Sequence, residues 1–437
     1  MSFELEIESL DTQGRGVARR DGKVVFVEGA LTGERVRADL TGEKPSYDLA
    51  RTAEMLRASP DRRTPRCEYF GTCGGCALQH AGARAQVAAK QRELEDNLAR
   101  IGKVSAGMLL PAVYGEEWGY RHRARLSVRY VAKKGGALVG FRERKSTYVA
   151  DMANCEVLPP RVSRLIPQLR ALVSVLESRA RMPQIEVAVG DAVDVLVFRH
   201  LDPLSASDAE RLRGFAEASG AWVWLQPAGP ASATPFHPAQ APGLYYELPE
   251  FGVRIEFAPT DFTQVNHGVN RMLVRRALRL LDPRPGERIA DLFCGLGNFT
   301  LPIARSGARV TGLEGSAGLI ERARSNAALN GLAAGASFEV ADLFLAGEAA
   351  LDKHGPFDKL LIDPPREGAM GVVKALTREW PHRIVYVSCD AATLARDAGV
   401  LVNTRGFTLS AAGVVNMCPH TAHVESIAVF DRDRPAD

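Results

Sequence analysis

The clearest pattern in the chain is an alternation of short apolar runs with amphipathic stretches, which begins near residue 255. Each run has the length of a strand and is followed by a loop and then by apolar residues at helical spacing. Strands and helices that alternate in this way form a mainly parallel, doubly wound sheet, and we expect that architecture for the C-terminal part of the chain. The runs span residues 289–293, 309–313, 337–340, 359–362 and 384–388.

The N-terminal residues follow a different pattern. Short runs at 3–7, 23–27 and 35–40 are separated by glycines, which predicts a small closed β-barrel of the oligonucleotide-binding type. The middle of the chain combines three closely spaced cysteines, a helical stretch at 81–101 and strands at 121–149. We therefore expect three domains, which comprise residues 1–57, 58–255 and 256–437.

Composition narrows the class of protein. The chain has 437 residues, of which 46% are hydrophobic and 24% charged, and this excludes wholesale disorder and a small disulfide scaffold. No run approaches the ~20 apolar residues of a membrane-spanning helix, and the acidic, alternating start is unlike a signal peptide. We expect a cytoplasmic protein with no membrane partner, in which the seven cysteines are reduced and serve a metal or catalysis.

The net charge of +3 says little about partners, but its distribution is informative. Between Tyr120 and Tyr148 there are nine Lys or Arg residues and one acid, Glu143. Such a run is often only a solvated face of a sheet. Here Tyr120, Tyr130, Phe141 and Tyr148 are interleaved with the charges, which favours a surface that binds phosphates and stacks bases.

Three cysteines have the spacing C-x5-C-x2-C, namely Cys67, Cys73 and Cys76, and glycines occupy the turn between the last two. Cys155 is the only other cysteine before residue 294 and is the candidate fourth ligand. Four thiolates suit either an iron–sulfur cluster or a structural zinc ion. Zinc sites usually consist of two short C-x2–4-C hooks, so the long first spacing and the solitary fourth cysteine favour the cluster.

A nucleotide site is predicted where the first C-terminal strand ends. Gly295 and Gly297 allow a tight turn and a close backbone approach to a ligand, and the third glycine of a dinucleotide fingerprint is absent. Glu314 ends the second strand, where a carboxylate can bind both ribose hydroxyls, and Asp342 follows the third. Together these features predict an S-adenosylmethionine site.

Three further residues predict the chemistry. Asp363, in an Asp-Pro-Pro-Arg sequence, ends the fourth strand; Cys389 ends the fifth; and Glu425 precedes the last apolar strand. Amino-methylating enzymes carry an aromatic residue where Arg366 stands, which argues against an amine target. A thiolate that adds to carbon 6 of uracil makes carbon 5 nucleophilic enough to accept a methyl group, after which a base removes the carbon 5 proton. Because a thiol pKa is ordinarily about 8.5, we expect nearby His or Arg to favour the thiolate.

Taken together, these motifs resemble the RNA uracil-C5 methyltransferase family, over nearly the whole chain. The motifs are 262–266, 291–300, 363–366, 388–390 and 420–425. The chain is most similar to the bacterial 23S ribosomal RNA branch, which has an N-terminal TRAM domain and a [4Fe-4S] cluster. The resemblance implies an α/β protein with a C-terminal Rossmann-like S-adenosylmethionine methyltransferase domain, an N-terminal TRAM barrel and a central α+β iron–sulfur domain.

The resemblance also implies residue roles. Cys389 resembles the nucleophile and Glu425 the base. The cofactor shell corresponds to Gln264, Phe293, Asn298, Glu314, Asp342 and Asp363, and the cluster ligands to Cys67, Cys73, Cys76 and Cys155.

The expected substrate is a uridine in 23S ribosomal RNA, and the expected oligomeric state is a monomer. A transfer-RNA uracil-C5 methyltransferase is the nearest alternative, although that branch lacks both the TRAM domain and the cluster. A non-catalytic RNA-binding protein with a redox-sensing cluster is the alternative from another class, but it would have no need of Cys389 and Glu425.

Overall fold

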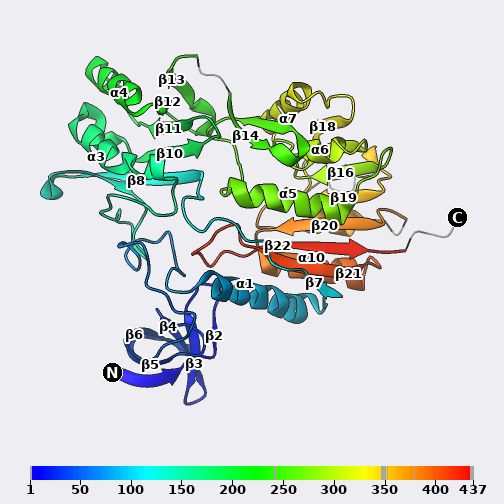
Figure 1. The fold of residues 1–437 in the computed structure, drawn as a ribbon, viewed down its shortest axis with the longest axis horizontal. Helices are drawn as coiled ribbons and strands as arrows, with labels where there is room; N and C mark the ends of the chain where they lie inside the picture. The colour runs from blue at the N-terminus through cyan, green and yellow to red at the C-terminus, as the bar shows by residue number, and fades with distance from the viewer. Residues whose placement is uncertain (1, 241–242, 346–350, 352, 378, 434–437) are drawn as a thin grey trace.

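The computed structural model describes the whole chain except residues 1, 241–242, 346–350, 352, 378 and 434–437. Its N-terminal part is a six-stranded sheet with the order β1-β5-β6-β4-β3-β2 (Figure 1). Because β1 also contacts β3, the sheet curls around a single apolar core, as the barrel prediction requires. Its strands are β1 (Ser2–Glu6), β2 (Ser9–Leu10), β3 (Gly16–Arg20), β4 (Lys23–Glu28), β5 (Arg35–Glu43) and β6 (Tyr47–Arg57).

A second six-stranded sheet occupies the middle of the chain, with the order β13-β12-β11-β10-β8-β9. Side chains of α3 and α4 complete its core. The elements are β8 (Arg123–Val131), β9 (Gly136–Gly140), α2 (Pro160–Ser163), α3 (Leu165–Val175), β10 (Gln184–Val189), β11 (Asp194–Arg199), α4 (Ala206–Ser219), β12 (Trp222–Gln226) and β13 (Thr234–His237). The hairpin of β14 (Leu244–Leu248) and β15 (Val253–Phe257) leads on to the last part.

The C-terminal part is an eight-stranded sheet with the order β18-β17-β16-β19-β20-β22-β21-β7. The five predicted runs form its parallel strands β16 to β20, and β22 is antiparallel to both of its neighbours. The elements are α5 (His267–Leu281), β16 (Arg288–Leu292), α6 (Thr300–Ala304), β17 (Arg309–Glu314), α7 (Ala317–Leu329), β18 (Ala336–Val340), β19 (Lys359–Ile362), α9 (Met370–Ala375), β20 (Arg383–Ser388), α10 (Ala391–Asn403), β21 (Thr408–Val415) and β22 (Glu425–Asp431).

Two apolar clusters cover the two faces of this sheet. Strand residues such as Ile289 and Val385 pack with α5, α6 and α7 on one face. Their neighbours Ala290 and Ile384 point the other way, toward α9 and α10, because side chains alternate along a strand. These runs therefore have apolar residues on both faces of the strand, as is usual for strands that are buried on both faces.

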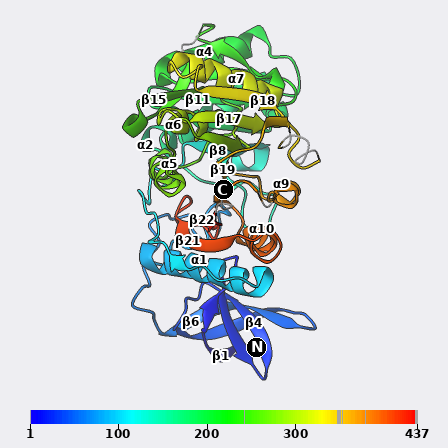
Figure 2. The ribbon, with the colours of Figure 1, turned by 90° about the vertical axis from the view of Figure 1, so that its right-hand side faces the viewer.

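One segment does not follow the expected division at residues 57 and 255. The helix α1 (Ala83–Asn97), which continues into the π-helical turn η1 (Leu98–Gly102), packs on α10, and β7 (Met108–Leu109) pairs with β21 at the edge of the C-terminal sheet. In Figure 2, α1 lies between the barrel and this sheet. Leu94 and Leu98 are completely or almost completely buried in the α10 cluster. This amphipathic helix thus belongs to the C-terminal core, which its position in the sequence did not indicate.

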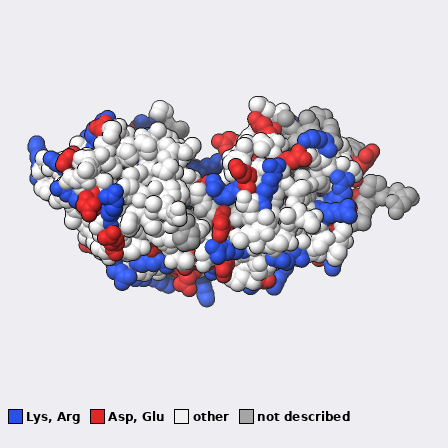
Figure 3. All heavy atoms as spheres, turned by 90° about the horizontal axis from the view of Figure 1, so that it is seen from above, with Lys and Arg blue, Asp and Glu red and all other residues white. Residues whose placement is uncertain are grey.

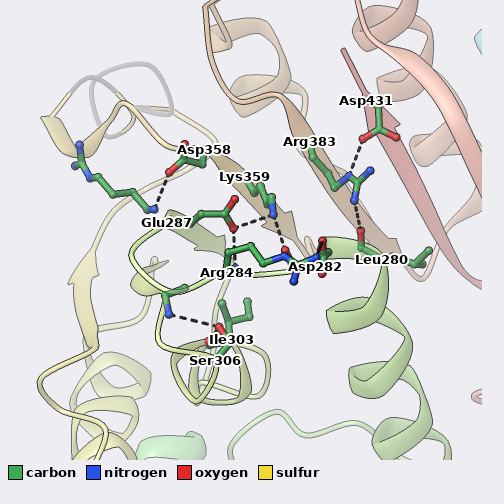
Figure 4. A network of polar contacts seen from close by, with 12 residues as sticks. Leu280, Asp282, Arg284, Glu287, Ile303, Ser306, Asp358, Lys359, Arg383 and Asp431 are labelled. Atoms are coloured by element: carbon green, nitrogen blue, oxygen red, sulfur yellow. Dashed lines mark hydrogen bonds and ion pairs between the residues drawn. The ribbon is translucent and has the colours of Figure 1, made fainter. Parts of the chain in front are cut away.

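Polar contacts at the amino ends of the C-terminal strands tie that edge together (Figure 4). The Lys359 ammonium, on a largely buried side chain, donates to the Asp282 carbonyl at 2.5 Å and to the Glu287 carboxylate at 2.8 Å. The Arg383 guanidinium donates to the Asp431 carboxylate at 2.7 Å. These charged groups pair with one another and stabilise the amino ends of the strands. In sheets of this kind, ligands bind at the opposite, carboxyl ends of the strands.

No helix in the described part of the chain is long and apolar enough to cross a membrane.

Candidate active site and cysteine cavity

A cavity of about 750 Å³ opens at the carboxyl ends of the parallel strands. All eight residues that the sequence predicted for the cofactor and for catalysis line it. They are Gln264, Phe293, Asn298, Glu314, Asp342, Asp363, Cys389 and Glu425. The structure therefore brings together residues that are up to 161 positions apart, from Gln264 to Glu425.

The glycine-containing loop after β16 forms the floor of this cavity. Phe293, Gly295 and Gly297 all have positive φ, at 63°, 53° and 90°. The Gly295 amide donates to the Glu314 carboxylate at 3.3 Å, and the other oxygen of that carboxylate accepts from the Ser316 amide at 3.0 Å. Glu314 is thereby held at the end of β17 beside the turn, where the sequence predicted a ribose-binding carboxylate.

Two residues that the sequence analysis missed orient Asn298. The Tyr246 hydroxyl donates to the Asn298 Oδ1 at 2.9 Å, and the Asn270 amide exchanges two hydrogen bonds with the Asn298 amide at 2.9 and 3.0 Å. Tyr246 lies on β14 and Asn270 in the first turn of α5. Neither belongs to a motif, so only the folded arrangement reveals them.

The pairing of β20 with β22 brings Cys389 and Glu425 together. Ser388 pairs with Ser426 in the antiparallel register, so the next positions outward are Cys389 and Glu425. Directly opposed residues of antiparallel strands have Cβ atoms about 4.5–5.5 Å apart. The Cys389 thiol and the Glu425 carboxyl group are thus neighbours at the carboxyl end of β20, and both line the cavity.

Burial raises the pKa of three groups at this edge, namely Glu425, Asp363 and Cys389. The pKa of Glu425 rises to about 8 because the group is desolvated and because Asp363 is nearby. The pKa of Asp363 rises to about 7 through burial alone. Burial also raises the pKa of the Cys389 thiol to about 11, and the charges of Glu425 and Asp363 add to the effect.

The Arg366 guanidinium lowers the pKa of Cys389, which is the direction that the sequence analysis expected of a nearby His or Arg, but desolvation and the two carboxyl groups outweigh it. Arg366 also lies against His423, with Nη2 and Nδ1 3.2 Å apart. Arg366 and His423 both line the cavity.

The four predicted cluster cysteines line a second cavity, of about 200 Å³. Burial is the main cause of a raised pKa for all four thiols, to about 11 for Cys76 and about 12 for Cys155. The Gly75 amide donates to the Cys73 sulfur at 3.4 Å. Within the described residues, no three Cys, His, Asp or Glu side chains lie close enough together to hold a single metal ion.

The two cavities are adjacent, because Arg121 and His423 line both of them.

The basic strands around Arg121 differ in part from the predicted stacking surface. Tyr120 is buried, and its hydroxyl donates to the Pro419 carbonyl at 2.9 Å, whereas Tyr148 is 73% exposed. Four of the nine basic residues form ion pairs with carboxylates; these are Arg123, Arg125, Lys134 and Lys145.

Comparison with known proteins assigns the chain to a family. A family model described as tRNA (Uracil-5-)-methyltransferase matches residues 252–433, and a TRAM domain model matches residues 2–50. The chain is 60% identical over 436 residues to the 23S rRNA (uracil(1939)-C(5))-methyltransferase RlmD of Nitrosospira multiformis, and the match covers 99% of both chains. The chain belongs to the RNA uracil-C5 methyltransferase family.

A second relative and a solved structure agree with this assignment. The enzyme of the same name from Thiobacillus denitrificans is 60% identical over 433 residues, which cover 99% of this chain and all of that one. The fold matches that of the Pyrococcus abyssi tRNA (uracil-54, C5)-methyltransferase, solved in complex with S-adenosyl-L-homocysteine, with a TM-score of 0.75 at 24% identity over 98% of this chain and 99% of that one. The family resemblance and the fold class that the sequence predicted are both confirmed.

The buried carboxyl groups should make stability depend on pH. Asp291, beneath the cavity, is fully buried, and burial raises its pKa to about 7. Between its ordinary pKa near 3.8 and pH 7 the folded protein keeps a proton that the unfolded chain loses, so stability falls as the pH rises through this window. One such group contributes up to about 1.4 kcal/mol per pH unit.

We expect Asp291→Asn to remove this contribution, so that its unfolding free energy falls less steeply between pH 5 and 7 than that of the wild type. Urea unfolding at several pH values measures the slope. Asp21→Asn, at an exposed turn, is the control and should keep the wild-type slope. Equal slopes for wild type and Asp291→Asn would contradict the prediction.

Proposed function

We propose that this protein methylates carbon 5 of a uridine in 23S ribosomal RNA, with S-adenosylmethionine as methyl donor, and that the target is uracil 1939, as the names of its relatives state. The observation that carries the proposal is the opposed pair of Cys389 and Glu425 in the cavity that also contains Glu314, Asp342 and Asp363. A methyltransferase for an ordinary amine or hydroxyl has no need of a thiol there. Methylation of an unactivated pyrimidine carbon needs both a nucleophile and a base.

The lining residues suit the proposed cofactor. Glu314 offers a carboxylate to the ribose hydroxyls, Asp342 lies where the adenine edge would be, and Phe293 supplies an aromatic face. Gln264, Asn298 and Asp363 complete the polar lining, with Asn298 fixed by Tyr246. When bound, S-adenosylmethionine supplies an electrophilic methyl group. The carboxyl groups of Asp363 and Glu425 suit a cavity that accepts a sulfonium cation.

Two side chains carry out the proposed chemistry on the uracil. After the Cys389 thiol has lost its proton to water, its sulfur attacks carbon 6 and the electron pair of the C5–C6 double bond moves toward carbon 5. That carbon would then take the methyl group as the bond between the methyl group and the sulfonium sulfur breaks, which leaves an uncharged thioether. Glu425 then takes the proton from carbon 5, and the sulfur leaves as the double bond re-forms. With its pKa raised to about 8, Glu425 is a stronger base than an ordinary carboxylate.

The raised pKa of Cys389 also has a consequence for the order of events. Burial is the main cause of this shift, and the nearby Glu425 and Asp363 carboxyl groups add to it. A cation held in the same cavity would act in the opposite direction and favour the thiolate. We therefore expect a bound sulfonium cofactor to favour the reactive form of Cys389.

Cys67, Cys73, Cys76 and Cys155 are proposed to hold a [4Fe-4S] cluster. They are the four cysteines of one buried cavity, and thiolates are the donor set that iron–sulfur clusters require. Each thiolate of such a cluster binds a different iron, so the four sulfurs surround a volume and do not need to converge on one point. The desolvation that now raises their pKa values would be offset by the positive charge of the irons.

The barrel and the basic strands are proposed to bind the RNA. The TRAM match covers the barrel, and Arg125 and Lys145 of the basic segment have side chains that are 67% and 68% exposed. Figure 3, which views the molecule from the side away from the barrel, shows Lys and Arg together with acidic residues in the hollow between two lobes. Phosphate contacts of the barrel and the basic strands would supply affinity, while a flipped uridine enters the cavity. The protein is further proposed to act as a cytoplasmic monomer.

The choice of RNA substrate distinguishes a 23S ribosomal RNA methyltransferase from a transfer-RNA methyltransferase. We expect the purified protein to methylate a 23S ribosomal RNA fragment around uridine 1939 and to leave a transfer RNA unmodified at matched salt, because the ribosomal enzymes are 60% identical to it and the transfer-RNA enzyme only 24%. Transfer of labelled methyl groups, with the sites mapped as 5-methyluridine, measures the choice. The same fragment with cytidine at the target position is the control. Efficient methylation of the transfer RNA alone would overturn this choice.

Cys389→Ala and Glu425→Gln should fail in different ways. Without the thiol no covalent bond forms, so Cys389→Ala should lose turnover by several orders of magnitude while it still binds the cofactor. Glu425→Gln still allows addition and methyl transfer but not proton removal, so a protein–RNA adduct should accumulate. Denaturing electrophoresis would show this adduct as a slowly migrating band that is absent from Cys389→Ala. Near-normal turnover of Glu425→Gln without the band would exclude Glu425 as the base.

Protein purified without air should be brown and should contain about four iron and four sulfide per chain, as a [4Fe-4S] cluster requires. Iron and acid-labile sulfide assays, together with the absorption spectrum, measure this. Cys73→Ser should lose most of both, whereas Cys294→Ser, outside the cysteine cavity, should retain them. Stoichiometric zinc without sulfide would refute the cluster.

A further inference from the structure

The loop between β21 and β22, residues 416–424, carries side chains to both cavities. Met417, Cys418 and His423 line the active site, and Thr421 and His423 line the cysteine cavity. Glu425, the proposed base, follows directly as the first residue of β22. The path of this loop therefore determines the position of Glu425.

Most polar contacts that hold the loop come from a distant part of the chain. The amides of Ala77 and Leu78, immediately after Cys76, both donate to the His420 carbonyl, at 2.8 and 2.9 Å. The Lys90 ammonium donates to the Cys418 carbonyl at 3.0 Å, and the Tyr120 hydroxyl to the Pro419 carbonyl at 2.9 Å. Three successive carbonyls of the loop thus accept hydrogen bonds from residues 77–120.

Gln86, in the first turn of α1, holds the same loop through its side chain. Its Oε1 accepts from the His420 amide at 2.7 Å, and its Nε2 lies 3.1 Å from the His420 Nδ1. The Trp118 ring stacks on the His420 ring, with the ring centroids 3.9 Å apart. Gln86 and His420 are 1% and 2% exposed, so water cannot replace these hydrogen bonds without a rearrangement.

His420 also has a backbone conformation that needs this support. Its φ is +64°, in the left-handed region that residues other than glycine rarely adopt. Such a conformation is strained and persists only where the surroundings determine it. In this loop the surroundings are the segment after Cys76, together with Gln86, Trp118 and Tyr120.

We propose that Gln86 and the segment that follows Cys76 position Glu425 through their hydrogen bonds to His420. Gln86 is thus a positioning residue: it touches neither cavity, and it acts through the loop that leads to the base. The same contacts connect the two cavities, so an intact cysteine cavity keeps the base in place. The catalytic consequence rests on the proposed function, whereas the order of the loop can be measured without it.

The test uses the full-length protein with its iron content verified. Gln86→Met keeps the length of the side chain but removes its contacts to His420, together with the hydrogen bonds that Nε2 donates to the Leu78 and Ala81 carbonyls in the segment after Cys76. We expect faster hydrogen exchange at the amides of residues 416–424, with β16 and β19 unchanged. We also expect kcat to fall about 10- to 100-fold, as displacement of a catalytic group by an ångström can do, with little change in KM for RNA. Gln91→Met is the matched control, because Gln91 lies on the same helix and its side chain donates to the Glu95 carboxylate and not to the loop.

Tyr120→Phe removes one hydroxyl and keeps the ring, so it tests the same contact network if Gln86→Met does not fold. It should raise exchange in residues 416–424 and lower kcat in the same direction. Removal of iron from the wild type by a chelator should likewise raise exchange in this loop. Unchanged exchange in either folded variant would overturn the proposal. Unchanged exchange after loss of iron would overturn the link to the cysteine cavity. A protein that shows these exchange changes but methylates no uridine would refute the proposed function and not the positioning role.

Discussion

The antiparallel pairing of β22 with β20 is the constraint on which the rest of the site depends. Parallel strands alone would place Asp291, Asp363 and Cys389 at one edge, each followed by a helix. Because β22 runs in the opposite direction, its first residue lies at the same edge of the sheet. Glu425, before Ser426, is therefore opposite Cys389, after Ser388. The proposed nucleophile and the proposed base, from the end of one strand and the beginning of another, are thereby opposed on a rigid frame, which is more precise than two loops would be.

Burial has opposite consequences at the two edges of the sheet. At the amino edge Lys359 is paired with Glu287 and capped by a carbonyl, so a largely buried charge is stabilised by its partners. At the carboxyl edge Asp363 and Glu425 are desolvated, and their pKa values rise to about 7 and 8. Acids in this state are poised to exchange protons near neutral pH, and such perturbed groups are typical of sites that carry out chemistry.

Much of this site could be predicted from the sequence, because strand ends are visible in the pattern. The runs that become β16 to β20 mark one edge, and the residues just after them, such as Asp363 and Cys389, must lie there. Tyr246 and Gln86 could not be predicted in this way. Their roles depend on a hairpin and a helix that reach the site from outside the alternating pattern, and no spacing rule links them to Asn298 or His420.

Two expectations from the sequence depend on surroundings that the sequence does not show. A nearby His or Arg was expected to favour the Cys389 thiolate, and Arg366 acts in that direction, but the sequence does not show how much water the fold removes or that two carboxyl groups share the space. Tyr120 was expected to face RNA, but it lies buried against the loop at Pro419. In both cases the residue type indicates what a group could do, and its surroundings, assembled from several distant segments, decide what it does.

The helix α1 joins these observations. It packs against α10 through Leu94 and Leu98, which makes it part of the catalytic core, and it follows closely after the cysteine segment in the chain. A short connection between Cys76 and a helix fixed on the catalytic sheet leaves the cysteine cavity little freedom to move relative to the active site. Arg121 and His423, which line both cavities, also connect them. Residues 83–109 are therefore the structural element that makes the metal-binding and methyl-transferring parts of the proposed enzyme one unit.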